Sequence, residues 1–131
     1  MQVSRKLMRW YMPAVFATVI FATTVLQGST VASAFVNLDK LLHVVLYGGM
    51  GALVSMALHK PGRPVSWRVA LVAVIISSAY GAFEEYHQSM VPGRTSSGED
   101  ELANLAGALL GAGWYLVAAH RWPWISQVLG R

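Results

Sequence analysis

The chain has 131 residues, of which 55% are hydrophobic and 12% charged, and it carries a net charge of +4. Soluble domains have charged side chains at about a quarter of their positions, so this composition indicates a membrane protein. The positive charge does not indicate nucleic-acid binding, because Lys and Arg flank apolar runs instead of forming one patch. The chain has no cysteine, which excludes disulfides, thiolate metal sites and a cysteine nucleophile.

Four apolar segments follow one another, each near the roughly 17 to 25 residues that a membrane-spanning helix needs. They are residues 11–27, 41–58, 67–83 and 102–119. We therefore predict an all-α integral membrane protein, a compact bundle of four transmembrane helices forming one domain over residues 1–131. Pro61, Gly62 and Pro64 end the second helix and predict a tight turn before the third.

The first segment has a second interpretation. Three basic residues between positions 5 and 9 precede its apolar run, and Ala32-Ser33-Ala34 follows, which is the order found in a cleaved secretory signal peptide. We favour a retained helix, because the apolar run is long for a signal peptide. Cleavage would leave three spans and an external amino terminus.

Charged residues divide the predicted helix ends into two groups. All six acidic residues lie in segments 28–40 and 84–101, whereas eight of the ten basic residues lie near the termini or between the second and third segments. The positive-inside rule places these eight in the cytoplasm, so we predict cytoplasmic termini and an acidic outer face. Aromatic residues that suit membrane-interface anchors flank the cytoplasmic ends: Trp10, Tyr11, Trp67, Trp122 and Trp124.

Small residues recur at interface spacing in the second and fourth segments. The second segment has Gly48, Gly51, Ala52 and Ser55, and the fourth has Ala103, Ala106, Gly107, Gly111 and Ala112. Small side chains let membrane helices approach closely, so we expect these two helices to pack together.

Asp39, Lys40 and His43 open the second segment. On a helix, Asp39 and His43 are four residues apart and Lys40 and His43 three apart, within side-chain reach. Asp39 also suits a helix amino terminus, and Lys40 suits an anchor at the membrane surface. His43 lies a turn inside the apolar run, where an ionisable group is costly and needs a partner or a task. We therefore take His43 as a candidate catalytic base, and Asp39 and Lys40 as candidate binding residues.

The third segment continues at helical spacing into Glu84-Glu85-Tyr86-His87-Gln88. Two carboxylates beside an imidazole fit general acid–base chemistry, a divalent metal or a proton-coupled site, and a solvated helix end is the alternative. The spacing matches no zinc signature, so we assign no metal ligand. Glu85 is the candidate catalytic carboxylate, and His87 and Gln88 are candidate binding residues.

A predicted turn at Val91-Pro92-Gly93-Arg94 joins the third and fourth segments, and the serines after it suit a helix cap. A guanidinium binds phosphate or carboxylate with two hydrogen bonds, so Arg94 is a candidate binding residue for an anion or a nearby Glu. Asp100 and Asn104 lie four residues apart at the head of the fourth helix and are further candidates. A buried Asn needs a hydrogen-bond partner.

The order and spacing of these residues resemble the VanZ-like family. The resemblance lies in Asp39-Lys40-x-x-His43, Tyr80-Gly81, Glu85-x-His87-Gln88, Val91-Pro92-Gly93-Arg94 and Asp100-x-x-x-Asn104-x-x-Gly107. It implies a small multi-pass protein of the bacterial cytoplasmic membrane, with Glu85, not Glu84, as the functional carboxylate. It also implies a role in the cell envelope or in the response to antibiotics, since the family is named for a teicoplanin-resistance protein that acts apart from altered peptidoglycan precursors; it does not imply that this chain confers resistance.

Three functions fit the sequence and stay open. The first is binding or remodelling of a lipid-like or lipid-linked molecule at the outer leaflet, with Lys40 and Arg94 holding an anionic headgroup. The second is an intramembrane hydrolase or transferase of phosphate-bearing lipids, with His43 or Glu85 as base. The third is a structural assembly partner whose polar cluster only joins helices. The sequence identifies no cofactor, and both a monomer and a homo-oligomer fit it.

Overall fold

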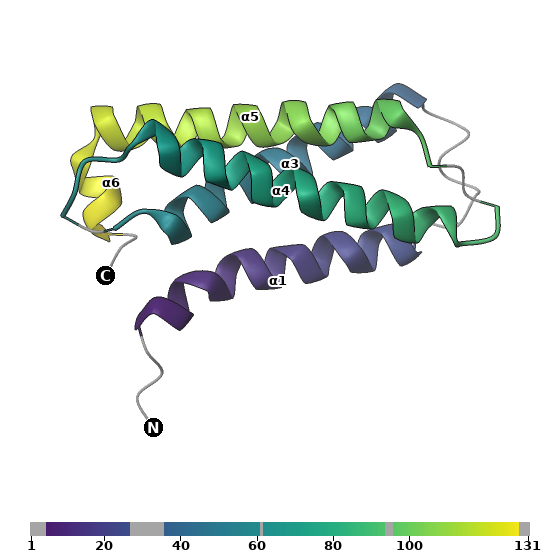
Figure 1. Ribbon diagram of the computed structural model, residues 1–131, viewed down its shortest axis with the longest axis horizontal. Helices are drawn as coiled ribbons and strands as arrows, with labels where there is room; N and C mark the ends of the chain where they lie inside the picture. The colour runs from purple at the N-terminus through teal and green to yellow at the C-terminus, as the bar shows by residue number, and fades with distance from the viewer. Residues whose placement is uncertain (1–4, 27–35, 61, 94–95, 129–131) are drawn as a thin grey trace.

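The computed structural model is helical throughout its described length, residues 5–26, 36–60, 62–93 and 96–128, apart from short connections (Figure 1). The helices are α1 (Arg5–Leu26), α3 (Val36–Leu58), α4 (Trp67–Ser89), α5 (Gly98–Arg121) and the short α6 (Pro123–Val128). The all-α class predicted from the sequence is confirmed. The cleavage motif at residues 32–34 lies outside the described residues.

The outer surface of the bundle is apolar. Leu41, Val45, Ile75, Leu110 and Val117 are all more than half exposed. Apolar side chains suit a hydrocarbon surrounding, and helices satisfy their own backbone hydrogen bonds there, so the bundle is stable in a lipid bilayer. Among the described residues, three helical stretches are long and apolar enough to cross a membrane: Leu38–Leu58, Trp67–Ser89 and Gly98–Arg121. The apolar stretch of α1, Leu7–Thr23, is shorter.

α3 and α5 pack closely together, as their small residues predict. A Cβ atom added at Gly107 would overlap the carbonyl oxygen of Val44, and one added at Gly111 would overlap that of Gly48. The two backbones approach this closely because these positions have no side chain. The core shared with α4 includes buried residues from all three helices: Tyr47, Ala73 and Ala108.

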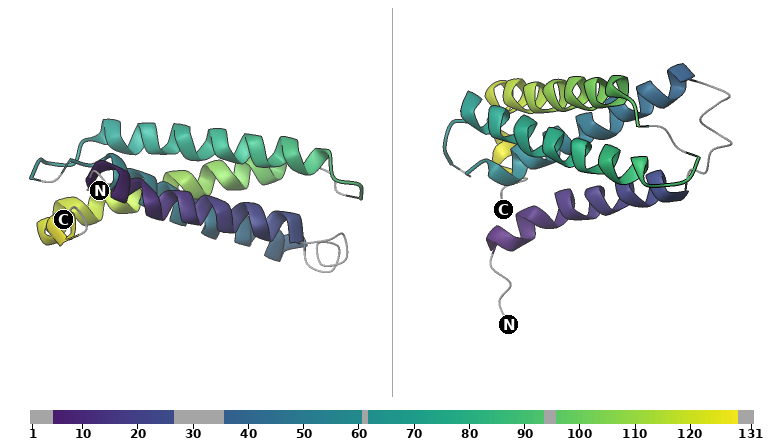
Figure 2. Two further views of the ribbon diagram at one scale, coloured as in Figure 1. Left: turned by 90° about the horizontal axis from the view of Figure 1, so that it is seen from below. Right: turned by 45° about the vertical axis from the view of Figure 1, so that its right-hand side comes forward.

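α1 lies along one side of this three-helix core (Figures 1 and 2). Its Ile20 is buried in the core, and its Phe16 ring packs over Gly49 of α3, where an added Cβ would lie 2.8 Å from the ring. The hydroxyl of Tyr80 on α4 donates a hydrogen bond to the carbonyl of Ala17 at 2.7 Å. α1 is therefore held by apolar packing and by a hydrogen bond to its backbone.

Glycine and serine set the helix ends. The chain leaves α3 at Leu58, as the following Pro-Gly loop predicts, and Gly62 adopts a φ of +77° that favours glycine. Ser97 caps α5, as the serines after residue 94 predict: its hydroxyl accepts a hydrogen bond from the backbone N–H of Asp100 at 3.1 Å. Ser66 caps α4 in the same way. The Ser97 cap fixes where the polar first turn of α5 begins.

The helices differ from the sequence-based expectation in two features: α1 and α3 begin earlier, α1 at Arg5 and not at Tyr11, and a short helix is added near the carboxyl end. α3 begins at Val36 and not at Leu41, because Asp39 and Lys40 lie in its first two turns, where charged side chains still reach the surface. α6 was not expected, and it starts at Pro123, whose fixed φ suits the first position of a helix. Hydropathy alone misses both features, because each lies beyond an apolar run.

Candidate functional site

The two ends of the bundle differ in charge. At one end α3 and α5 begin and α4 finishes; we call it the acidic end, and it carries all six acidic side chains: Asp39, Glu84, Glu85, Glu99, Asp100 and Glu101. The opposite end, the basic end, carries Arg9, Lys60, Arg63, Arg68 and Arg121. The charge segregation in the sequence is therefore also a segregation in space.

His43 is the buried centre of the acidic end. It lies on α3 with 9% of its surface exposed, and its Nδ1 is 2.7 Å from the amide oxygen Oδ1 of Asn104 on α5. Since an amide oxygen only accepts, Nδ1 carries the proton and donates it. The other nitrogen, Nε2, is then without a proton in the neutral ring. It lies 4.0 Å from a carboxylate oxygen of Asp39, too far for a hydrogen bond.

Asn104 orients this imidazole from the facing helix. It is fully buried, and its Nδ2 donates a hydrogen bond to Oε2 of Glu101 at 3.4 Å, which agrees with the amide oxygen facing His43. The expectation that a buried Asn104 finds a partner is confirmed. Gly81 of α4 makes room for this amide, because a Cβ there would lie 2.9 Å from Nδ2.

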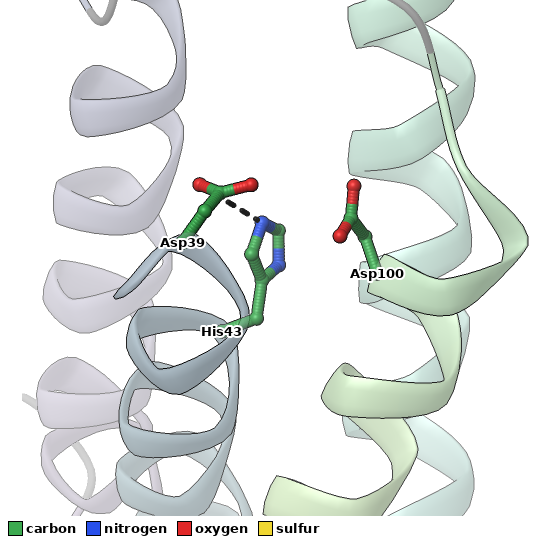
Figure 3. Close-up of side chains that lie close together, drawn as sticks. All are labelled: Asp39, His43 and Asp100. Atoms are coloured by element: carbon green, nitrogen blue, oxygen red, sulfur yellow. Dashed lines mark ion pairs between the residues drawn. The ribbon is translucent and has the colours of Figure 1, made fainter. Parts of the chain in front are cut away.

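Asp100 brings a second carboxylate to His43. The Ser97 cap places it in the first turn of α5, facing α3. Figure 3 shows the His43 ring between the carboxylates of Asp39 and Asp100. One side-chain nitrogen or oxygen atom from each of these three residues lies within 4.8 Å of the other two, close enough to hold a metal ion.

Glu85 and Gln88 bring α4 to the same end. Glu85 is 8% exposed, and its Oε2 accepts a hydrogen bond from the backbone N–H of Ser97 at 3.3 Å. Its other oxygen, Oε1, is buried and has no hydrogen-bond partner among the described residues. The amide nitrogen of the buried Gln88 likewise has none. Buried polar atoms are nearly always paired, so these two mark an incomplete network.

Two predicted site residues lie apart from this cluster, and a third, Arg94, is not among the described residues. Lys40 forms an ion pair with the exposed Glu99 of α5, and not a contact with His43. His87 turns to another face of α4 and packs against the Phe21 ring of α1, with 5.0 Å between ring centroids.

Sequence analysis missed two polar groups of the acidic end. Glu101 accepts a hydrogen bond from Asn104. The Tyr80 hydroxyl, which donates to Ala17, lies 3.3 Å from Oε1 of the buried Glu84. Both pairs have helical spacing, three and four residues apart, which is the signal that identifies them.

The basic end also contains a buried histidine, His59, which is 5% exposed. Its Nε2 donates to the carbonyl of Arg63 at 2.8 Å, so in the neutral ring its Nδ1 accepts from the Tyr115 hydroxyl at 2.9 Å. Arg9 of α1 donates to the His59 carbonyl at 3.1 Å. Both ring nitrogens are therefore satisfied by the protein.

A surface pocket of about 330 Å³ lies beside His59 at the basic end, lined also by Arg63, Val65, Ala119 and Pro123. Asp39, Lys40, His43, Glu85, Asp100 and Asn104 all lie at the other end of the bundle. The chemically varied side chains and this pocket thus occupy different places.

The apolar helices and the buried polar cluster define this chain as a helical membrane protein with a polar site at one end of its bundle. That site can accept protons, bind a cation or receive hydrogen bonds. The VanZ/LLP1 family matches residues 3–119, so the chain belongs to this family, as its motifs predict. No curated protein and no solved structure matches the chain.

Proposed function

We propose that this protein crosses the bacterial cytoplasmic membrane four times, with α1 as the first crossing and both termini in the cytoplasm. The charge pattern supports this topology: apart from Lys40, Lys and Arg of the described helices and loops gather at the basic end, and cytoplasmic surfaces are enriched in these residues. The acidic end then faces outward.

We further propose that the acidic end binds a lipid-like or lipid-linked molecule in a cell-envelope or glycopeptide response. The observation that carries this proposal is the incomplete polar network at the head of an apolar bundle. A cluster that only joined helices would satisfy its own polar atoms, but Oε1 of Glu85 and the amide nitrogen of Gln88 stay unpaired among the described residues. A bound molecule with polar groups would complete the network.

An anionic headgroup suits Lys40, the cationic side chain of the acidic end among the described residues. Lys40 is partly exposed at the head of α3, where it forms an ion pair with Glu99, an exposed carboxylate. Exposed ion pairs are weak, so a phosphate or carboxylate headgroup can take the place of Glu99. The family's link to teicoplanin, which carries a fatty acyl chain, supports a ligand with an apolar tail.

An intramembrane hydrolase or transferase of phosphate-bearing lipids is the second candidate. It is favoured by Nε2 of His43, which lacks a proton in the neutral ring and accepts no hydrogen bond from the described residues. A general base needs such a nitrogen within reach of the proton that it removes. Accumulation of a substrate and loss of a product separate this function from binding alone.

The test is mass spectrometry of lipids and lipid-linked precursors from a strain lacking the protein, complemented with the wild type, Glu85→Gln or Glu99→Gln. We expect the same species to change in the null and Glu85→Gln strains. Glu99→Gln is the matched control, since Glu99 is exposed and outside the buried cluster. An unchanged profile in the Glu85→Gln strain, at equal amounts of folded protein, would contradict the proposal.

The topology is tested with single cysteines, which the cysteine-free chain makes simple. Ser96→Cys reports the acidic end and Pro64→Cys the basic end; both positions are exposed. We expect a membrane-impermeant thiol reagent to label only Ser96→Cys in intact cells. Labelling of Pro64→Cys alone would reverse the orientation.

A further inference from the structure

We propose that Asp39, His43 and Asp100 bind a divalent cation of the Zn²⁺ or Mn²⁺ class. This inference concerns the chemistry of the acidic end and does not depend on a lipid ligand. Its basis is a set of three donor atoms that converge without satisfying one another.

His43 is prepared for a cation by its partner on the facing helix. Asn104 accepts the Nδ1 proton, which leaves a lone pair on Nε2, on the side of the ring that faces Asp39. Metal-bound histidines in proteins use the same arrangement, with the second nitrogen donating to a fixed oxygen. Three groups that all accept hydrogen bonds then face one another, and a cation or a proton between them relieves their mutual repulsion.

The three donor atoms lie slightly farther apart than the ligands of a bound ion, and side-chain rotation can bring them around an ion. The three donor atoms lie within 4.8 Å of one another, and Nε2 is 4.0 Å from Asp39. Bonds of about 2.0–2.2 Å to zinc place neighbouring ligands roughly 3–3.5 Å apart. Asp39 and Asp100 are only half-buried and come from the heads of two helices, so their carboxylates can turn inward by the remaining distance.

Glu85 supplies an independent reason to expect a ligand at this place. Its side chain is more than nine-tenths buried, its Oε1 has no partner among the described residues, and its Oε2 is fixed by the N–H of Ser97, three residues before Asp100. Ser97 also caps α5 and positions Asp100, so the Glu85 carboxylate lies at the same helix head as Asp100. A water molecule on the cation would donate a hydrogen bond to Oε1 and complete the network.

The donor set selects the class of ion. One imidazole and two carboxylates suit zinc or manganese, whereas magnesium and calcium prefer oxygen alone. A chain without cysteine offers no thiolate to compete for zinc. The other occupant of this position is a proton on Nε2, and a metal titration distinguishes the two.

The experiment is isothermal titration of Zn²⁺ into the full-length protein in non-ionic detergent, purified through a tag without histidine and stripped with a chelator. We expect one equivalent to bind to the wild type and at least a tenfold weaker affinity for Asp100→Asn, which preserves shape at a half-buried position. Glu99→Gln removes a neighbouring but exposed carboxylate, and we expect it to bind like the wild type.

Helix content by circular dichroism accompanies each titration, so that unfolding is not mistaken for a lost ligand. His43→Gln provides a second variant, which should lose Zn²⁺ binding and leave only the weaker affinity of carboxylates for Mg²⁺. Absence of a stoichiometric site in the wild type would overturn the proposal. Equal weakening by Glu99→Gln and Asp100→Asn would also overturn it, because a diffuse acidic surface would then explain the binding. No lipid is present, so failure here leaves the lipid proposal standing.

Discussion

Two buried histidines, one at each end of the same helix pair, have opposite surroundings. His59 follows α3 at the basic end and uses both ring nitrogens, towards Arg63 and Tyr115. His43, at the acidic end of α3, uses one, towards Asn104 of α5. Burial alone therefore does not distinguish a structural histidine from a site histidine. The distinction is whether the second ring nitrogen has a hydrogen-bond partner in the protein.

This difference separates stability from function along the length of the bundle. A fully satisfied histidine contributes to folding and offers nothing to a ligand, because no lone pair or proton remains available. A half-satisfied histidine among carboxylates costs stability, since repulsion and desolvation oppose it. We infer that the acidic end tolerates this loss of stability because a ligand occupies the position beside Nε2 of His43 in the working protein.

The largest expected effect is the loss of both histidine environments at once. In Gly111→Val the new side chain would collide with the backbone of α3 at Gly48, and overpacking against backbone costs about 3 kcal/mol or more. Both histidines lose their α5 partners if the helices separate, so we expect loss of monodisperse protein in size-exclusion chromatography. Gly113→Val is the control, because a Cβ at Gly113 meets no atom within 4 Å. Equal losses in both variants would contradict the close α3–α5 contact.

Tyr115→Phe should affect the basic end alone. It removes the hydroxyl that donates to Nδ1 of His59 and leaves a buried acceptor unpaired, a cost of about 1–2 kcal/mol within a membrane bundle. We expect a lower thermal midpoint and an unchanged Zn²⁺ affinity. Tyr86→Phe, at an exposed position, controls for the loss of a hydroxyl. A loss of Zn²⁺ binding in Tyr115→Phe would show that the two ends are coupled.

Gly81→Ala should affect the acidic end alone. The added methyl would lie 2.9 Å from Nδ2 of Asn104 and 3.1 Å from Oε2 of Glu101, so the amide that orients His43 must shift. Loss of an orienting contact weakens metal sites by roughly 10- to 100-fold, and we expect the lower part of that range because the contacted atoms end flexible side chains. The measurement is the Zn²⁺ titration, with Gly113→Ala as control. Unchanged affinity would mean that Asn104 does not set the position of His43.

Lys40→Gln should have the smallest effect on stability. Its ion pair with Glu99 is exposed, and solvent and salt screen such pairs. We expect the thermal midpoint to stay within experimental error, while recovery of the lipid profile in the null strain is reduced. A clear fall in the midpoint with full recovery would instead assign Lys40 a structural role.

The sequence predicts the helices and the α3–α5 pairing well, because both depend on local properties. Apolar runs mark the helices, and glycines such as Gly107 and Gly111 mark where backbones meet. It also predicts that Asp39 and His43 share a face, because helical spacing determines this. The part of α3 before Leu41 and the helix at Pro123 escape hydropathy, since polar or terminal residues contribute to them.

The contents of the site are harder to predict, because they depend on contacts between helices. Spacing alone does not reveal that Asn104 sets the tautomer of His43, that Lys40 pairs with Glu99, or that His87 packs on Phe21. The same limit applies to Asp100, which is 57 residues from His43 in the sequence and shares a cluster with it only in the folded bundle.

The most direct test compares the two ends in one strain lacking the protein, complemented with Glu85→Gln or Tyr115→Phe at matched levels of folded protein. The readouts are the envelope lipid profile and tolerance to teicoplanin. We predict that Tyr115→Phe restores both, despite a lower thermal midpoint, and that Glu85→Gln restores neither. If recovery instead follows thermal stability in both variants, the acidic end is a structural joint and the assignment of a site there is wrong.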